Sequence, residues 1–164
     1  MSKIKFYWED FEVGQVRNLG TISPTREAII AFASEFDPQP FHLDEEAAKA
    51  SVFGGLCASG WHTCAMAMRL MVTHFLQETA SMGSPGLDHI RWRKPVFPGD
   101  TLRLQTTVLE TKPMGSRPDM GMTRNLWEMF NQHGDEVLRM EAWGMFKRRP
   151  SATPISEMAA QGPT

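Results

Sequence analysis

The sequence has little of the features that would by themselves assign a class of protein. It contains only two cysteines, Cys57 and Cys64, with no CxxC spacing, which argues against a disulfide framework and a zinc module. The formal net charge of -2 gives no general attraction for nucleic acid or an anionic membrane. No apolar run approaches the roughly 18 residues that a spanning helix needs, and no signal peptide is evident. We therefore expect a cytoplasmic protein with reduced thiols and no nucleic-acid or membrane partner.

The length and composition fit one globular domain. A chain of 164 residues can bury a core without disulfides or metal. Its 41% hydrophobic and 22% charged residues lie in the ordinary range for such proteins. Residues 150–164 mix proline, serine, threonine, alanine and glycine without periodicity. We therefore expect a single domain over residues 1–149, followed by a disordered tail over residues 150–164.

The first part of the chain predicts a strand followed by a helix. Apolar and polar residues alternate over residues 11–16 around one glycine, which predicts a short strand with an early bend. Ser23 and Pro24 then suit the N-cap and the first position of a helix. That helix should end near Phe36, because Pro38 disfavours helical geometry in the residue before it. We expect its buried face to consist of five apolar side chains: Ile29, Ile30, Phe32, Ala33 and Phe36.

A longer helical pattern covers about residues 61–78 and contains neither glycine nor proline. Apolar residues occupy most of its circumference, and Arg69 is the one charge at its midpoint. A helix of this kind is stable in water only when other elements cover it on nearly all sides. We therefore interpret it as the central helix of the fold. Before it, Asp44 is a good N-cap for a short helix that extends through Lys49.

From residue 87 onward the sequence predicts strands. Four candidates cover residues 87–93, 101–111, 120–132 and 136–147, with a turn at 95–100, a longer mobile loop at 112–119 and a hairpin connection at 131–135. This order favours an α+β fold in which an antiparallel meander wraps around the central helix. One sheet would cover only part of that helix and would leave a free edge, so we expect a homodimer or a dimer of dimers.

One loop after the first helix carries two proton-handling groups. Asp37 and His42 lie five residues apart on a backbone stiffened by two prolines, which we expect to prevent helix formation there. Each group has a structural alternative, because an aspartate before proline commonly makes a turn hydrogen bond and a histidine can bind a backbone carbonyl. Further along the chain, Ser59 and Gly60 precede the central helix. The free N–H groups of that helix end, beside a small residue, predict an oxyanion site.

Two further possibilities involve histidine. His62 lies on the first turn of the central helix, where it either takes part in chemistry or simply orients the turn. A metal site would need to combine His62 with Asp37, His42 and Asp44. These four residues have no recognised ligand spacing, so we expect no metal.

The loop resembles the motif of a known family. The motif consists of aspartate, two further residues, proline, an apolar residue, histidine and, six positions later, alanine or serine. The residues that match it in register are Asp37, Pro40, Phe41, His42 and Ala48. By this pattern the chain resembles the MaoC-like dehydratases, the (R)-specific enoyl-CoA hydratase group of the hot-dog superfamily.

The resemblance extends over about residues 11–148, with some departures. Residues 94–102 are similar to the family's Pro-Val-x-Pro-Gly-Asp-Thr segment. Phe36 stands where glycine is usual, and Gln39 stands where asparagine is usual. The family's His-Gly pair at the start of the central helix is Ser59-Gly60 here, which keeps a backbone donor and removes an imidazole.

The resemblance implies a single hot-dog domain and a hydro-lyase. Asp37 and His42 would activate a water that adds syn to a trans-2-enoyl-CoA, or remove it from an (R)-3-hydroxyacyl-CoA. The Gly60 N–H would polarise the thioester carbonyl. Which of the two side chains is the primary base is open, and no cofactor is implied beyond the coenzyme A that the substrate carries. An acyl carrier protein thioester is an open alternative.

The resemblance also implies a set of substrate-binding residues: Ser59, Trp61, His62, Arg91, Arg93 and Lys94. The three basic residues form either a solvated strand edge or a contact with the phosphates of coenzyme A. The methionines Met66, Met68 and Met71 either pack in the core or line a flexible acyl pocket. Two other functions stay open: a non-catalytic hot-dog subunit that binds acyl-CoA or a partner, and an acyl-CoA thioesterase. The second is disfavoured because residues 60–77 contain no aspartate or glutamate.

Overall fold

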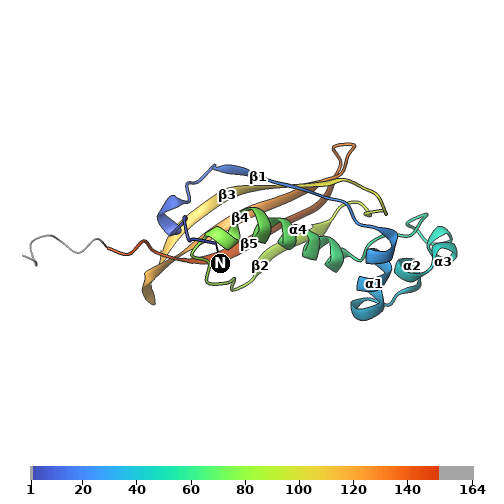
Figure 1. Cartoon of the computed structure of the whole chain (residues 1–164), viewed down its shortest axis with the longest axis horizontal. Helices are drawn as coiled ribbons and strands as arrows, with labels where there is room; N and C mark the ends of the chain where they lie inside the picture. Colours follow the sequence, from blue (N-terminus) through green and yellow to red (C-terminus); the bar gives the residue numbers. More distant parts are fainter. Residues whose placement is uncertain (1, 152–164) are drawn as a thin grey trace, which may run out of the picture.

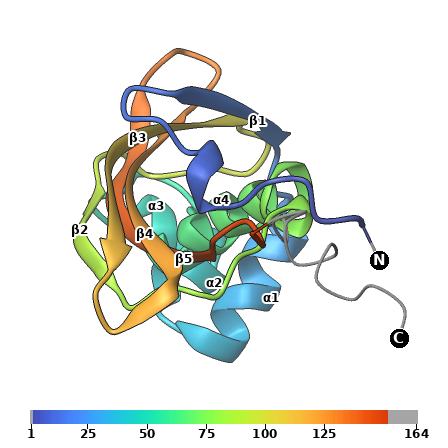
Figure 2. The ribbon, with the colours of Figure 1, turned by 90° about the vertical axis from the view of Figure 1, so that its left-hand side faces the viewer.

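The computed structural model describes residues 2–151 and shows a five-stranded antiparallel sheet curved around one helix, α4 (Gly60–His74), as seen in Figures 1 and 2. The strands are β1 (Val16–Ile22), β2 (Leu87–Trp92), β3 (Leu102–Met114), β4 (Arg117–Phe130) and β5 (Glu136–Lys147), in the order β1-β3-β4-β5-β2. This arrangement confirms the expected α+β fold with a long central helix. The tail expected over residues 150–164 lies, beyond residue 151, outside the described residues.

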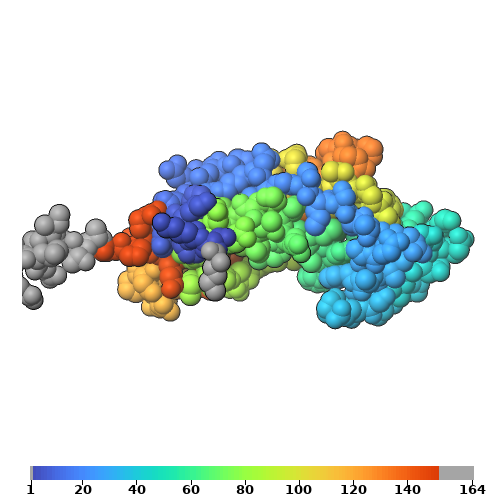
Figure 3. All heavy atoms as spheres, viewed as in Figure 1, coloured from blue at the N-terminus to red at the C-terminus, as the bar shows by residue number. Residues whose placement is uncertain are grey.

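Three short helices form a lobe beyond one end of the sheet, next to the start of α4 (Figures 1 and 3). This helical lobe consists of α1 (Arg26–Phe36), α2 (Pro40–Leu43) and α3 (Glu45–Lys49). Two short 3-10 helices, η1 (Trp8–Asp10) and η2 (Leu76–Glu78), flank the other end of α4. The lobe carries the Asp37–His42 segment, so its position decides where that segment meets the rest of the fold.

Helix α1 ends as expected at Phe36, but its start and its buried face were predicted incorrectly. Its N-cap is Thr25, whose hydroxyl accepts the Ala28 N–H, and not Ser23. Only Ile29 and Ala33 are buried among the five residues proposed for its core face, and Phe36 is 64% exposed. The physical reason is the position of α1, which packs at the end of the molecule and not on the sheet. Other elements therefore cover only a narrow stripe of the helix.

The expectation that two prolines prevent helix formation around His42 was wrong. Pro40 is the first residue of α2, where a missing N–H leaves no helical hydrogen bond unmade. The four-residue helix then places His42 in its interior. The predicted cap of the next helix is confirmed, because the Asp44 carboxylate accepts the Ala47 N–H at 2.7 Å.

Two predictions about the strands were wrong. The first strand begins at Val16 rather than Phe11, because Gly14 takes a left-handed φ of +87° and makes a turn in the expected alternation. Residues 112–119 are not a long loop, since β3 and β4 continue into a tight hairpin around residues 115–116. Pro113 and Pro118 lie beyond the residues of β3 and β4 that pair with β1 and β5, so no strand on the outer side of the hairpin needs their missing N–H groups.

The strand order also differs from a meander in chain order. Strand β2 pairs with β5 and not with β3, so residues 93–101 cross from one edge of the sheet to the interior. Both sides of β3 are occupied, by β1 and β4, which leaves the free side of β5 for β2. The other side of β2 is therefore an edge of the sheet within the described chain.

Helix α4 is buried on one face only. Its covered residues are His62, Thr63, Met66, Ala67, Leu70 and Met71. Its opposite face leaves Trp61 57%, Met68 45% and Val72 40% exposed, so the protomer does not cover the helix on nearly all sides. In Figure 3, green atoms of α4 form part of the molecular surface. No helix within residues 2–151 has the length and apolar character needed to cross a membrane.

We predict that Gly121→Ala lowers the free energy of unfolding by about 1–3 kcal/mol, a typical cost of overpacking. Gly121 is buried on β4, and a Cβ there would overlap the indole of Trp8, whose Nε1–H donates to the Met122 carbonyl at 3.1 Å. Urea denaturation measures the change. Gly115→Ala is the matched control, since its Cβ would meet no atom within 4 Å. Equal effects of the two substitutions would contradict this account.

Candidate active site

Asp37 and His42 come from neighbouring parts of the helical lobe and lie side by side. Asp37 is the C-cap residue of α1, and its N–H donates to the Ala33 carbonyl at 2.9 Å. His42 Nε2 lies 3.4 Å from Asp37 Oδ2, and the two side chains are only 6% and 18% exposed. The turn of α2 brings the imidazole back toward the carboxylate. The structure therefore brings together the two groups that the sequence motif proposed.

A second contact fixes the orientation of the His42 ring. Its Nδ1 lies 2.7 Å from the carbonyl oxygen of Cys57, and a carbonyl can only accept, so Nδ1 carries the proton. Nε2 is thereby left facing Asp37, and a proton shared between the two side chains, or a bridging water, satisfies both groups. Burial raises the pKa of the nearby Cys57 thiol to about 11, which keeps it neutral.

The carboxylate of Asp37 is stabilised in its charged form. Burial raises the pKa of Asp37, but the nearby Ser59 hydroxyl, the hydrogen bond from Gln39 and the charge of His42 outweigh it, and the pKa falls below its ordinary value. The Gln39 amide donates to Oδ1 at 2.8 Å. The Ser59 hydroxyl is fully buried and makes no regular hydrogen bond, so its contact with Asp37 is the looser of the two. Asp37 is thus available as a proton acceptor.

Gly60 begins α4, and its N–H makes no hydrogen bond within the described chain. Its carbonyl accepts the Trp92 indole N–H at 2.9 Å. A Cβ on Gly60 would lie 2.6 Å from the Trp92 ring, so this position requires a residue without a side chain. Sequence reasoning missed Trp92 and named Trp61, which is mostly exposed and packs edge-on against Trp92. No local signal could have shown this, since 32 residues separate Gly60 from Trp92.

A cavity of about 400 Å³, called here the site cavity, joins these elements. Its wall includes His42, Gly60, Thr63, Trp92, Arg93 and Lys94. The two basic residues are each held in an ion pair, Arg93 with Glu136 at 2.7 Å and Lys94 with Asp135 at 2.9 Å. Arg91 lies outside this wall, where its side chain donates to the Ile90 carbonyl. The predicted basic patch therefore contributes two of its three members to the cavity.

His62 takes a different position from the other candidates. Its ring stacks on Phe32 of α1, with centroids 4.7 Å apart and planes 7° from parallel. Its Nδ1 is buried without a hydrogen-bond partner in residues 2–151, and burial lowers the pKa of the ring. It does not belong to the wall of the site cavity. The neutral ring thus joins α4 to the helical lobe.

The four residues considered for a metal site do not converge. Asp37 and His42 are close together, whereas Asp44 caps α3 and His62 stacks on Phe32. Across residues 2–151, no three histidine, cysteine, aspartate or glutamate side chains are grouped so that they could hold a metal ion.

Comparison with known proteins agrees with this geometry. The family model described as a MaoC-like domain matches residues 10–127, and the chain belongs to this family. The crystal structure of a MaoC-like dehydratase from Rhodospirillum rubrum is 45% identical, with a TM-score of 0.80, and the match covers 90% of this chain and 100% of that one. The fold is therefore the hot-dog fold that the sequence motif implied.

Two further relatives carry names that describe an activity. The (R)-hydratase PhaJ1 from Pseudomonas aeruginosa is 25% identical, with a TM-score of 0.68 over 90% of this chain and 93% of that one. The mesaconyl-CoA hydratase of Cereibacter sphaeroides is 42% identical over 64 residues, which is 39% of this chain and 18% of that protein. Family and relatives together support a hydratase or dehydratase.

We predict that Ser59→Ala raises the pKa of Asp37 toward its ordinary value, because the hydroxyl that stabilises the charged carboxylate is lost. Carboxyl carbon chemical shifts followed over a pH titration measure this. Ser34→Ala is the control, since that hydroxyl donates to the Ile30 carbonyl on the exposed side of α1. An unchanged titration of Asp37 in Ser59→Ala would show that the two groups do not interact.

Proposed function

We propose that the protein adds water to a trans-2-enoyl-CoA, or removes it from an (R)-3-hydroxyacyl-CoA. The observation that carries this proposal is the buried Asp37–His42 pair, with Nε2 3.4 Å from Oδ2, and His42 in the wall of a cavity that also contains Gly60. A carboxylate and an imidazole in contact can hold one water and exchange its protons. The relatives named as hydratases support the same reaction class.

In the proposed reaction the water lies between Asp37 and His42. Its oxygen forms a bond to the β-carbon of the enoyl group while one of its protons passes to the pair. The electrons of the double bond move toward the thioester carbonyl, whose oxygen accepts the Gly60 N–H. The α-carbon then takes a proton from the pair on the same face, which gives syn addition. The two side chains act as one proton-holding unit, and we assign the first proton transfer to neither alone.

The remaining proposed contacts involve the coenzyme A phosphates and the acyl group of the substrate. Arg93 and Lys94 line the site cavity and would bind coenzyme A phosphates in competition with their own carboxylate partners. Arg91, whose one side-chain hydrogen bond in the described chain is to the Ile90 carbonyl, would bind phosphate without such competition. Trp61 would contact the acyl thioester near Gly60. Ser59, which is fully buried, and His62, which stacks on Phe32 outside the site cavity, would act on the substrate only through the residues packed against them.

Other parts of the proposal concern the context of the reaction. We propose that no cofactor takes part apart from the coenzyme A of the substrate, and that the reaction belongs to fatty acid metabolism. The chemistry needs neither a redox change nor a metal, because only water and protons move. The cytoplasmic location inferred from the sequence stays a prediction.

We predict that the purified protein hydrates crotonyl-CoA or a longer or branched enoyl-CoA, measured as loss of enone absorbance. Asp37→Asn and His42→Ala should each lower kcat at least about 100-fold, the usual contribution of a positioned acid or base. Asp119→Asn and His74→Ala are matched controls, as both residues are exposed, Asp119 near the start of β4 and His74 at the end of α4 opposite Gly60.

Three outcomes would contradict the proposed function. Turnover of a broad enoyl-CoA panel that does not exceed that of the Asp37→Asn, His42→Ala double variant would favour a non-catalytic subunit. An (S)-alcohol as product would exclude the proposed stereochemistry. Release of free coenzyme A from the thioester would indicate a thioesterase, for which α4 offers no carboxylate.

We further propose that two copies of the chain associate through the uncovered face of α4 and the free edge of β2. Leu87 and Trp92 on β2 are 46% and 45% exposed, and Met68 and Val72 on α4 extend the same apolar character. A sheet edge with exposed apolar side chains is a common site of pairing between chains.

We expect Val72→Asp to convert a dimer to monomer at micromolar concentration, because it places a charge in the apolar contact. Sedimentation velocity measures the change. Val52→Asp is the matched control, since Val52 is 96% exposed in a loop of the helical lobe. A wild-type chain that sediments as a stable monomer would rule out this association.

A further inference from the structure

A second cavity lies at the other end of α4, between that helix and the sheet. Its volume is about 290 Å³, and no residue lines both it and the site cavity. Its wall is mostly apolar and includes aromatic and methionine side chains, among them Phe11, Met71, Phe75, Trp127, Met140 and Phe146. A wall of this kind fits an aliphatic chain, and methionine adapts to several chain shapes. The proposed hydration reaction makes no use of this cavity.

One charged residue belongs to this wall, Arg17 at the start of β1. Its guanidinium carbon lies 4.2 Å from the ring centroid of Phe75 and 5.4 Å from that of Phe11. Burial lowers the pKa of Arg17, so the position is unfavourable for its charge. Stacking on aromatic rings uses the face of the guanidinium and leaves the N–H groups at its rim without acceptors.

Arg17 differs from the other partly exposed arginines of the described chain in the lack of a partner for its side chain. Three arginines in residues 2–151 are only partly exposed: Arg17, Arg124 and Arg139. Arg124 and Arg139 each pair with two glutamates. The Arg17 side chain has neither a carboxylate within 4.0 Å nor a hydrogen bond to another residue described, although its backbone pairs with Thr106 of β3. Partly buried charges are usually paired, so Arg17 is the exception that needs an explanation.

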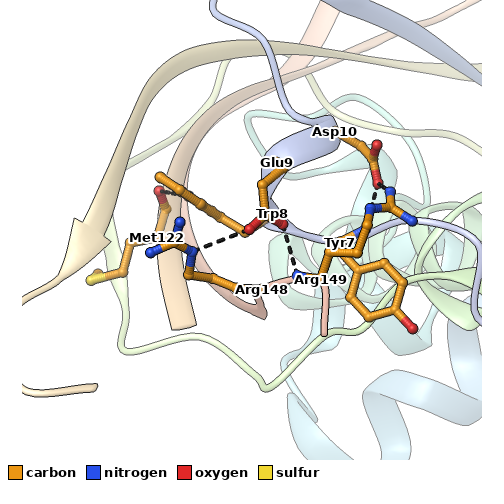
Figure 4. A network of polar contacts seen from close by, with 7 residues as sticks. All are labelled: Tyr7, Trp8, Glu9, Asp10, Met122, Arg148 and Arg149. Carbon is orange, nitrogen blue, oxygen red and sulfur yellow. Dashed lines mark hydrogen bonds and ion pairs between the residues drawn. The ribbon is translucent and has the colours of Figure 1, made fainter. Parts of the chain in front are cut away.

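The carboxylate that most influences Arg17 is already engaged elsewhere. Asp10 attracts Arg17 electrostatically, but its Oδ2 accepts the Arg149 guanidinium at 2.6 Å and the Tyr7 N–H at 2.8 Å. Figure 4 shows this network, in which Glu9 also binds Arg148 and the Arg149 backbone. The C-terminal end of α4 near Phe75 favours a positive charge. It does not account for an apolar cavity beside that charge.

We propose that the second cavity binds the carboxylate end of a short aliphatic chain, with Arg17 as its anion-binding residue. The rim N–H groups of a guanidinium match the two oxygens of a carboxylate, and the aromatic and methionine wall covers the chain. The carboxylate belongs either to a free fatty acid or to the distal end of a dicarboxylic acyl group. Both sources present a carboxylate at the end of an aliphatic chain. Cys64 lines the second cavity, and the residue before it, Thr63, lines the site cavity.

Calorimetric titration with octanoate tests the proposal on the full chain. We expect the wild type to bind octanoate at least about 10-fold more tightly than octanamide, since a hydrogen bond between charged groups is stronger than one to a neutral amide. Arg17→Met should remove that preference, and Arg17→Lys should retain part of it. Arg103→Met is the matched control, because Arg103 also lies over an aromatic ring, 5.0 Å from the centroid of Phe130, but outside the cavity.

Several results would overturn the proposal. Equal affinity of the wild type for octanoate and octanamide would show that the cavity does not recognise charge. An unchanged octanoate affinity in Arg17→Met, or an equal loss in Arg103→Met, would remove Arg17 from the site. Absence of binding to the wild type would show that the cavity is filled by other means. The comparison of octanoate with octanamide needs only the wild type. It therefore tests whether the cavity recognises a carboxylate even if Arg17→Met does not fold.

A kinetic experiment distinguishes the two sources of the carboxylate. If octanoate inhibits enoyl-CoA hydration competitively, the second cavity receives the distal carboxylate of the acyl group. If octanoate binds without competing, the ligand is a free fatty acid. This arm rests on the proposed function, whereas the calorimetric arm does not. A protein that binds octanoate through Arg17 without hydratase activity would therefore contradict the proposed function alone.

Discussion

The hydrogen bond between His42 Nδ1 and the Cys57 carbonyl is the contact on which the site depends. It ties the helical lobe to the segment before α4, and that segment is in turn held by the Ala58 N–H, which donates to the Val96 carbonyl at 2.8 Å. One contact thus sets the tautomer of His42, aims Nε2 at Asp37 and brings the lobe over the start of α4. The buried stripe of α1, the stacking of Phe32 on His62 and the buried Ala48 of α3 also attach the lobe, but none of them orients His42.

The two ends of α4 differ in chemistry, and this difference organises the molecule. At its start, Gly60 and His42 line the site cavity, and Asp37 and the buried Ser59 hydroxyl lie behind them. Toward its end, aromatic rings and methionines surround the second cavity, with Arg17 as the one charge in its wall. A helix that is apolar along its length can form part of both cavities, because the polar groups beside each cavity come from the elements packed against the helix. The uncovered face of the same helix is left for association.

Local features were predictable because they depend on a few neighbouring residues. The Asp44 cap, the end of α1 at Phe36 and the whole span of β5 follow from side-chain capping, proline geometry and strand alternation. The Asp37–His42 pair was predictable from its motif. Trp92 was not, because its role comes from contact with Gly60, and neither was the pairing of β2 with β5. Arg17 could not be singled out from the sequence, because its importance comes from the absence of a carboxylate partner near its side chain in the fold.

The sequence by itself determined the order of elements, the family motif and the residue types available for proton transfer, because these depend on short-range geometry. Only the tertiary structure decided that His42 Nε2 faces Asp37, that His62 stacks on Phe32 away from the site cavity, and that α4 leaves one face uncovered. The burial of a side chain, its ion pairs and its pKa all depend on contacts with residues that are far apart in the chain. They take definite values only when the sheet, the lobe and the central helix are assembled.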